Sequence, residues 1–374
     1  MTNIKICNKC VMDQTVPDIW FNHDGICNLC IEAMEKINAE VFKGHEGQLK
    51  LDSLVRQIKR STNKKYNCII GVSGGVDSSY VAYLTKDLGL KPLAIHLDNG
   101  WNTDTSVKNI KKILDKLDID LYTHVINWEE FRELQLSFLK SSIANAEIPT
   151  DQAITAILYK MASKFGIKYI INGGNVNSES IMPDSWMEDN LDTRLIKSIH
   201  KKYSKKSLKT YPMMGYIKLA YYILVKKIKY VGVLNFVDYD KEAAIKFLEN
   251  EFNWTPYKEK HFESIFTRWF QSFYLIHKFN IDKRKAHFSS LIISGYMERE
   301  SALFELKNDY LDQDSLTQDA EFIKEKFQLN HNEYTSLVSS NRQSIDNFKS
   351  YQPLLKRFKR FRGLLKSIAT ERDK

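Results

Sequence analysis

The sequence predicts an α/β protein, with a parallel-sheet domain, a cysteine-rich module before it and a helical region after it. Between residues 67 and 172, short apolar runs alternate with amphipathic helical patterns, which is typical of a parallel sheet with helices on both faces. The first apolar run, 68–72, leads directly into Ser-Gly-Gly-Val-Asp-Ser-Ser at 73–79. Four paired cysteines before residue 31 indicate the separate N-terminal module.

The chain of 374 residues is long enough for two or three domains. We expect a cysteine module over 1–45, a sheet domain over 46–250 and a helical region over 251–374. An insertion of one or two helices at about 176–235, acidic at first and basic after residue 197, is our candidate for covering the site. The pattern predicts strands over 67–73, 93–99, 121–127 and 168–172, and helices over 79–88, 105–117 and 151–165.

The N-terminal cysteines form two C-x₂-C pairs, Cys7 with Cys10 and Cys27 with Cys30, separated by sixteen residues. This spacing is typical of a structural zinc site, whose four thiolates leave no coordination position for catalysis. A disulfide pair and an iron–sulfur cluster are the alternatives. The fifth cysteine, Cys68, lies in the first predicted strand and is interpreted as a small core residue.

The segment 73–79 predicts an anion site, because a strand that enters a small-residue loop before a helix aims backbone N–H groups at one point. Gly74 and Gly75 allow a phosphate to approach the backbone, and the serines add hydroxyl donors. Asp77 would repel phosphates unless it held a cation, so we interpret it as a Mg²⁺ ligand. The alternative is an ordinary Gly/Ser turn.

No Gly-Lys-Ser/Thr follows this loop, which argues against a Walker A site. The loop resembles the pyrophosphate loop (PP-loop) of the N-type ATP pyrophosphatases, which have an adenine nucleotide alpha hydrolase-like fold. The resemblance implies that ATP is cleaved between its α- and β-phosphates and that a substrate oxygen is adenylylated.

Two further segments follow predicted strands, and ligands of parallel sheets bind at the carboxyl ends of strands. The first begins at His96 and includes Asp98 and Asn99, and the second is Asn-Gly-Gly-Asn at 172–175. We expect both to contact the same nucleotide as the loop. Helix caps or simple turns are the alternatives.

Nine more cationic than anionic side chains give the chain a formal net charge of +9, which favours an anionic partner such as nucleic acid, a nucleotide sugar or an acidic membrane face. We expect the excess of basic residues to be spread along the chain, so a solvated basic surface is an equally good interpretation of most lysines. The first ten residues are polar rather than a signal segment. Because the central apolar stretch 219–225 is too short to span a bilayer, we expect a cytoplasmic location.

The chain is similar to the N-acetyl sugar amidotransferases of pseudaminic-acid and lipopolysaccharide biosynthesis. The motifs that carry this resemblance are collinear over about residues 1–305: Cys-Asn-Lys-Cys-Val-Met-Asp at 7–13, the loop at 73–79, His-Leu-Asp-Asn-Gly-Trp at 96–101, Asn-Gly-Gly-Asn at 172–175, Lys-His-Phe-Glu-Ser at 260–264, Thr-Arg at 267–268 and Ile-Asp-Lys-Arg-Lys-Ala-His at 281–287.

The resemblance implies conversion of an acetamido group to an acetamidino group, with ammonia supplied by a glutaminase subunit and a synthase-like subunit similar to imidazole glycerol phosphate synthase. It implies ATP, Mg²⁺ and Zn²⁺ as cofactors. A cationic pocket that neutralises the α-phosphate would then be formed by Lys260, His261, Arg268, Lys283, Arg284, Lys285 and Arg299. The expected catalytic residues are Asp77, Lys260, His261 and Arg268, and the expected nucleotide-binding residues are Ser73, Gly74, Gly75, Val76, Asp77, Ser78, Ser79, His96, Asp98, Asn99, Gly173, Gly174, Asn175, Lys283 and Arg284.

Two other functions stay open. A tRNA-thiolating PP-loop enzyme would also combine zinc knuckles with a basic surface, but it needs cysteines for sulfur transfer and only Cys68 lies outside the paired set. A non-catalytic zinc-ribbon scaffold of a glycan-assembly complex is the second alternative, and the intact loop argues against it.

Overall fold

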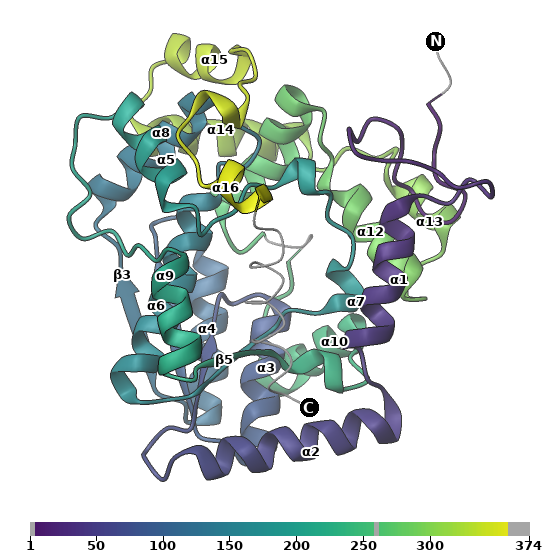
Figure 1. The fold of residues 1–374 in the computed structure, drawn as a ribbon, viewed down its shortest axis with the longest axis vertical. Helices are drawn as coiled ribbons and strands as arrows, with labels where there is room; N and C mark the ends of the chain where they lie inside the picture. Colours follow the sequence, from purple (N-terminus) through teal and green to yellow (C-terminus); the bar gives the residue numbers. More distant parts are fainter. Residues whose placement is uncertain (1–3, 258–261, 358–374) are drawn as a thin grey trace.

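In the computed structural model, which describes residues 4–257 and 262–357, a single parallel sheet lies beneath a large helical region (Figure 1). The sheet order is β3-β2-β1-β4-β5, and every neighbouring pair is parallel. The strands are β1 (Cys68–Gly71), β2 (Pro92–Asp98), β3 (Leu121–Val125), β4 (Tyr169–Asn172) and β5 (Lys229–Gly232). The predicted parallel-sheet α/β class is therefore confirmed.

The order of the strands reverses between β1 and β4. From β1 the chain continues outward to β2 and β3, and then returns to place β4 on the other side of β1. Such a switch point opens a crevice at the carboxyl ends of the two central strands. The segments 73–79 and 172–175 leave the sheet on the two sides of this crevice.

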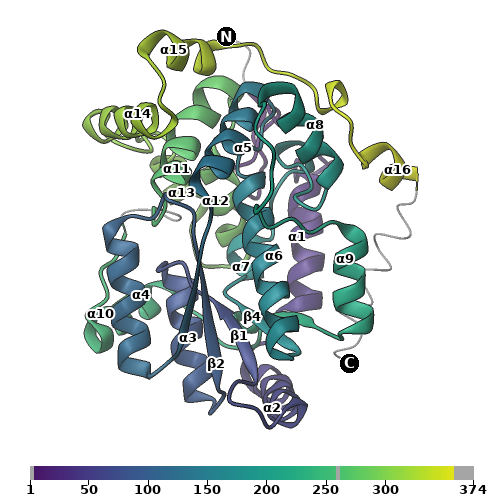
Figure 2. The ribbon, with the colours of Figure 1, turned by 90° about the vertical axis from the view of Figure 1, so that its left-hand side faces the viewer.

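Helices cover both faces of the sheet (Figure 2). On one face, Cys68 and Ile70 of β1 pack with apolar side chains of α2 (Gly44–Ser61), α3 (Val76–Asp87), α4 (Asp104–Leu117) and α10 (Lys241–Phe252). On the other face, Ile69 packs with α6 (Ile148–Phe165) and with Tyr222 and Ile223 of the π-helical turn η2 (Tyr221–Val225). This alternation along β1 follows from the two-residue period of a strand.

A third core joins the two ends of the chain. It contains the four paired cysteines, of which Cys27 and Cys30 lie at the start of α1 (Asn28–Glu40). The elements that share it are α5 (Trp128–Ser141), α11 (Ile265–Trp269), the π-helix η4 (Phe270–Phe279), α12 (Lys283–Ile293) and α14 (Gln313–Phe327). The cysteine module therefore packs on the C-terminal helices and has no separate core. The remaining helical elements are α7 (Val176–Glu179), η1 (Asp184–Trp186), α8 (Thr193–Tyr203), α9 (Tyr216–Ala220), η3 (Val233–Phe236), α13 (Arg299–Glu305), α15 (His331–Ser339), η5 (Ile345–Asn347) and α16 (Gln352–Arg357).

Three features differ from the sequence expectations. The segment expected to be an insertion supplies β5, whose four residues pair with β4, and α5 has no counterpart among the predicted helices. The helix after the loop begins at Val76 instead of residue 79, because Gly75 is extended and acts as its N-cap. Half of the loop is therefore the first turn of α3. Among the described residues, no helix is long and apolar enough to cross a membrane.

Candidate functional site

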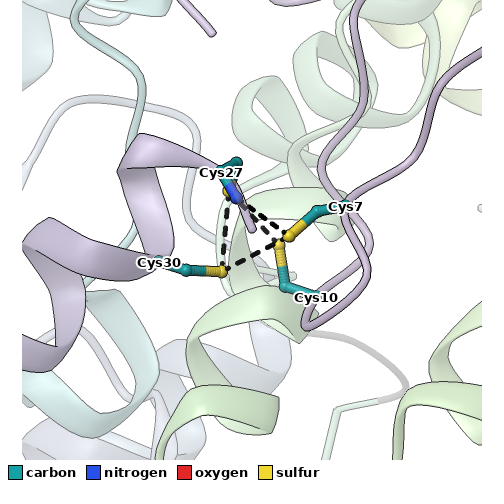
Figure 3. A group of neighbouring side chains, drawn as sticks. All are labelled: Cys7, Cys10, Cys27 and Cys30. Carbon is teal, nitrogen blue, oxygen red and sulfur yellow. Dashed lines mark hydrogen bonds between the residues drawn. The ribbon is translucent and has the colours of Figure 1, made fainter. Parts of the chain in front are cut away.

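The four paired cysteines converge on one point (Figure 3). Their Sγ atoms lie 3.8 Å apart for Cys7 and Cys30, 3.8 Å for Cys10 and Cys27, and 3.5 Å for Cys27 and Cys30. All four ligand atoms lie within 4.8 Å of one another, and the residues are buried. A tetrahedral ion with Zn–S bonds of about 2.3 Å requires S···S separations of about 3.8 Å. The set therefore fits one tetrahedral ion such as Zn²⁺, and the cysteines are too far apart for disulfides.

Residues of α12 and α13 hold this module in place. Arg299 donates from Nε to the Cys10 carbonyl at 3.1 Å and from Nη2 to the Cys7 carbonyl at 3.0 Å. Lys285 forms an ion pair with the buried Asp13 at 2.6 Å. Both cations were expected to line a phosphate pocket, and this expectation was wrong. They anchor the metal-binding module instead.

The conformation of the loop between β1 and α3 is fixed by contacts with Trp254 and Ser106. Trp254 donates from Nε1 to the Gly74 carbonyl at 3.1 Å, which fixes the peptide before Gly75. Gly74 has a φ of +83°, and a Cβ there would lie 2.5 Å from the Ser106 carbonyl oxygen, so no other residue fits. Within the loop, the N–H of Gly75 donates to Ser73 Oγ at 3.3 Å. The N-terminal N–H groups of α3 face the same region, as an anion site requires.

The second glycine pair closes the other wall of the crevice. A Cβ at Gly173 would lie 3.0 Å from the backbone carbon of Asp77. Gly173 therefore lets the end of β4 pack against the first turn of α3. The end of β4 and the loop therefore form one continuous surface.

Asp77 is oriented by a residue to which we assigned no role. Tyr239 donates from its hydroxyl to Asp77 Oδ1 at 2.6 Å. Burial of Tyr239, which is 4% exposed, and the neighbouring Asp77 carboxylate raise the pKa of the phenol well above its usual value, so the hydroxyl remains a donor. In the described chain, Oδ2 of Asp77 has no hydrogen-bond partner, so one oxygen remains to hold a cation.

Two cavities flank the loop. One, of about 500 Å³, lies on the β4 side and is lined by Asp77, Gly173, Gly174, Lys241 and His287, among others. The other, of about 610 Å³, lies on the β2 side, between the sheet, α6 and the C-terminal helices. Both are lined by Ser73, Ser78, Asn172, Glu179, Tyr230 and Glu263, so they form one cleft centred on the loop.

The end of β2 contributes to this cleft only in part. His96 lines the larger cavity, and its ring is fixed because Nδ1 donates to the Val72 carbonyl at 2.9 Å and Nε2 lies 3.2 Å from the amide of Asn102. Asn99 lines the same cavity. Asp98 instead accepts from the N–H of Gly100 at 3.0 Å, as a turn cap does.

The other residues that we expected to contact the nucleotide also fall into two groups, those that line the cleft and those that lie behind it. Ser73, Gly75, Val76, Ser78 and Gly174 line the cleft. Gly74 and Ser79 are buried behind it. Asn175 is 5% exposed and caps α7 by accepting from the N–H of Asn177 at 3.0 Å, so it supports the crevice without lining it.

Of the described residues that we expected to form the cationic pocket, only Lys283 lines the cleft. Arg268 makes a bidentate ion pair with Asp319, at 2.7 Å from Nε and 2.5 Å from Nη2, and Arg284 makes one with Asp282. These guanidinium groups are occupied by carboxylates and do not line the cleft of the described chain. Lys283 does line it, with Nζ 3.6 Å from Glu147 Oε2. Lys260 and His261 lie outside the described residues.

Several cleft residues were given no role in the sequence analysis. Glu263 accepts from Ser73 Oγ at 3.4 Å and lines both cavities. Glu147, Thr267 and Gln271 line the β2 side. The available signal was the dense polar run at 260–271, in which we weighted the cations and neglected the neutral and acidic side chains.

Family comparisons divide the chain in two. Residues 49–209 match a family described as NAD synthase. Residues 263–362 match a family described as LPS biosynthesis protein WbpG-like, C-terminal domain.

Among curated relatives, the chain is 27% identical over 139 residues to tRNA-specific 2-thiouridylase MnmA 2 of Fusobacterium nucleatum, which covers 35% of this chain and 38% of the relative. It is 32% identical over 138 residues to tRNA-specific 2-thiouridylase MnmA of Proteus mirabilis, covering 32% of this chain and 37% of the relative. The chain thus spans less than two fifths of the length of these relatives.

Two solved structures are similar at low scores. The NH3-dependent NAD synthetase from Campylobacter jejuni has a TM-score of 0.33 and 12% identity, over 83% of this chain and 99% of that one. The NMN synthetase from Francisella tularensis has a TM-score of 0.30 and 14% identity, over 59% and 100%. The fold is established instead by the sheet order, the loop and the family match.

The two matched stretches meet in the cleft. The first supplies Ser73, Asp77 and Gly173, and the second supplies Glu263 and Lys283. The chain therefore combines the parallel-sheet fold of the PP-loop superfamily with a C-terminal region similar to that of the WbpG-like proteins of lipopolysaccharide biosynthesis.

Proposed function

We propose that the chain is an ATP-dependent amidotransferase that converts the acetamido group of an N-acetylated sugar to an acetamidino group. One observation carries this proposal: the PP-loop and the WbpG-like region line a single cleft. A nucleotide held by the loop would therefore react with a molecule held by the C-terminal helices. The family that this region matches belongs to lipopolysaccharide biosynthesis, which points to a surface-glycan sugar as the acceptor.

The walls of the cleft suit this arrangement. On the β2 side, Ile95, Leu97, Ile154, Ile157 and Leu158 give an apolar wall for an adenine base. In the same cavity, Glu147, Thr267, Gln271 and Lys283 offer the donors and acceptors that a hydroxyl-rich sugar needs. Pyrophosphate would lie on the loop, toward the β4 side.

The chemistry follows from the poor leaving ability of an amide oxygen. That oxygen attacks the α-phosphorus of ATP, pyrophosphate leaves, and an O-adenylyl imidate forms. Ammonia then adds to the imidate carbon and AMP leaves. The loop and the first turn of α3 would stabilise the pyrophosphate charge, and water that competes with ammonia must be kept from the imidate. Asp77 would hold Mg²⁺, which neutralises phosphate charge.

Ammonia must come from outside this chain. All five cysteines are described: four form the metal-binding cluster, and Cys68 is fully buried in β1. Burial raises the pKa of the Cys68 thiol well above its usual value, so the residue is unsuited to hydrolysing glutamine. We propose a glutaminase subunit with a synthase-like subunit, similar to imidazole glycerol phosphate synthase, as the source.

The similarity to tRNA-specific 2-thiouridylases favours a second candidate, tRNA thiolation. The same cysteine inventory argues against it, because a buried, protonated Cys68 cannot carry sulfur to a bound nucleotide. A non-catalytic scaffold is the third candidate. The open cleft at an intact loop argues against that role.

Mass spectrometry tests the proposal directly. Acetamido sugars and their nucleotide conjugates are incubated with the chain, ATP, Mg²⁺ and ammonium, and the expected product is lighter by the difference between oxygen and NH, with AMP and pyrophosphate in equal amounts. Omitting ATP is the control. Sulfur incorporation into bulk tRNA would support thiolation instead, and an absence of ATP–pyrophosphate exchange with every acceptor would support the scaffold.

A further inference from the structure

One segment of the chain is strongly basic. Residues 193–237 contain ten Lys, one Arg and neither Asp nor Glu. The rest of the chain has 44 basic and 46 acidic residues, a formal charge of −2. These 45 residues alone therefore carry a formal charge of +11.

The first part of this segment forms a basic hollow. Arg194, Lys197 and Lys201 recur along α8 with helical spacing and line a cavity of about 250 Å³ together with Lys349 and Tyr351. The three α8 cations are exposed and have no ion pair with a carboxylate in the described part of the chain. Arg194 lies over the ring of Tyr351, with Cζ 5.8 Å from the centroid. The hollow therefore presents uncompensated positive charge.

The second part presents an apolar stripe. Ile217, Tyr221, Leu224 and Val225 recur at i, i+4, i+7 and i+8 along α9 and η2, and they are 89%, 45%, 41% and 63% exposed. The opposite side of the same helix buries Tyr222 and Ile223 against the sheet. Spacing of this kind places the four side chains on one face. Packing against the sheet accounts for the apolar residues of the inner face. It does not account for those of the outer face, which are exposed.

Hollow and stripe lie on the same side of the molecule. The ring of Tyr216, which begins α9, lies 6.0 Å from that of Tyr351 in the hollow. Figure 2 shows α8, α16 and α9 along one edge of the molecule. Lys218, Lys226 and Lys227 flank the stripe and are exposed. An apolar centre bordered by lysines is thus continuous with the basic hollow.

We propose that this face binds the surface of an anionic lipid bilayer. Aliphatic side chains on one side of a helix and lysines at its border are the features of interfacial helices, and lysine stems extend their charges to the headgroups. A protein interface would be depleted in lysine and enriched in arginine, whereas ten of the eleven cations here are lysines. Nucleic acid would leave the aliphatic stripe without a partner. The stripe ends five residues before Tyr230, which lines both cavities of the cleft, so binding would hold the cleft close to the membrane.

Sedimentation of the full chain with vesicles tests this proposal. We expect binding to vesicles of 70% phosphatidylcholine and 30% phosphatidylglycerol, weakened by salt, and little binding to phosphatidylcholine alone. Lys197→Gln with Lys201→Gln should lower the partition coefficient roughly 30-fold, and Ile217→Ser with Val225→Ser about tenfold. The matched control is Val107→Ser with Lys111→Gln on α4, which covers the opposite face of the sheet and has Val107 53% exposed. The control should bind as the unmodified chain does.

Circular dichroism and ATP–pyrophosphate exchange confirm that each variant is folded. Equal binding to both vesicle types, or an equal loss in the α4 control, would overturn the proposal. Failure of the unmodified chain to bind anionic vesicles at low salt would assign the face to a protein partner. Preferential binding of bulk tRNA that the same lysine substitutions abolish would assign it to nucleic acid.

Discussion

Tyr239→Phe removes a single oxygen and tests whether Asp77 must be held in one orientation. The hydroxyl donates to Asp77 Oδ1 at 2.6 Å from a ring that is 4% exposed. A hydrogen bond to a charged group contributes about 1.5–3 kcal/mol. If that energy orients the carboxylate toward Mg²⁺ in the transition state, kcat/KM for pyrophosphate release falls roughly 10- to 150-fold.

The assay is coupled pyrophosphate release at several Mg²⁺ concentrations, with thermal unfolding in parallel. We expect a higher Mg²⁺ requirement in Tyr239→Phe. Tyr80→Phe is the matched control, because its ring lies 5.2 Å from that of Tyr239 and its hydroxyl has no hydrogen bond to Asp77 in the described chain. Tyr80→Phe should keep the unmodified rate.

A double-mutant cycle tests whether Tyr239 affects pyrophosphate release through Asp77. Asp77→Asn alone should abolish pyrophosphate release while the fold stays intact, because a neutral amide binds Mg²⁺ far less well. Adding Tyr239→Phe to Asp77→Asn should then change little, since the two residues act as one unit. Full activity in Asp77→Asn, or equal losses in Tyr239→Phe and Tyr80→Phe, would refute the reasoning.

Three further predictions follow from the metal cluster, the nitrogen source and a buried ion pair. Cys27→Ser or Cys30→Ser should lose the bound metal and destabilise the third core, since structural zinc contributes roughly 10–16 kcal/mol in small metallo-domains; metal analysis of the unmodified chain that finds no zinc, or finds iron, contradicts the assignment. The isolated chain should use ammonium and not glutamine, measured as product formed with each donor, and glutamine should become the better donor once both partner subunits are added. Arg268→Ala should cost about 3–5 kcal/mol in urea unfolding, because it leaves Asp319 buried with its side chain 3% exposed, and Asp319→Asn in the same chain should recover much of that loss.

The nucleotide half of the site was predictable because its determinants are local in sequence. A strand, two glycines and the start of a helix are contiguous at 68–79. Each C-x₂-C pair likewise brings its two metal-binding thiols together within four consecutive residues. The convergence of 73–79 with 172–174 also followed, because parallel strands place their carboxyl ends at one edge. Asp98 and Asn175 make cap-type hydrogen bonds and do not line the cleft, because a short polar side chain after a strand serves equally well as a cap.

The partners of the C-terminal cations were decided only by the tertiary structure. Arg268 pairs with Asp319, and Arg299 with carbonyl groups almost three hundred residues earlier in the chain. No periodicity or spacing encodes such contacts, because a cation is satisfied by whichever carboxylate or carbonyl the packing brings near it. The same holds for β5, whose four residues Lys-Tyr-Val-Gly become a strand by pairing with β4. Local patterns thus determined the loop and the strand ends that form the proposed nucleotide site, and long-range packing determined which side chains surround it.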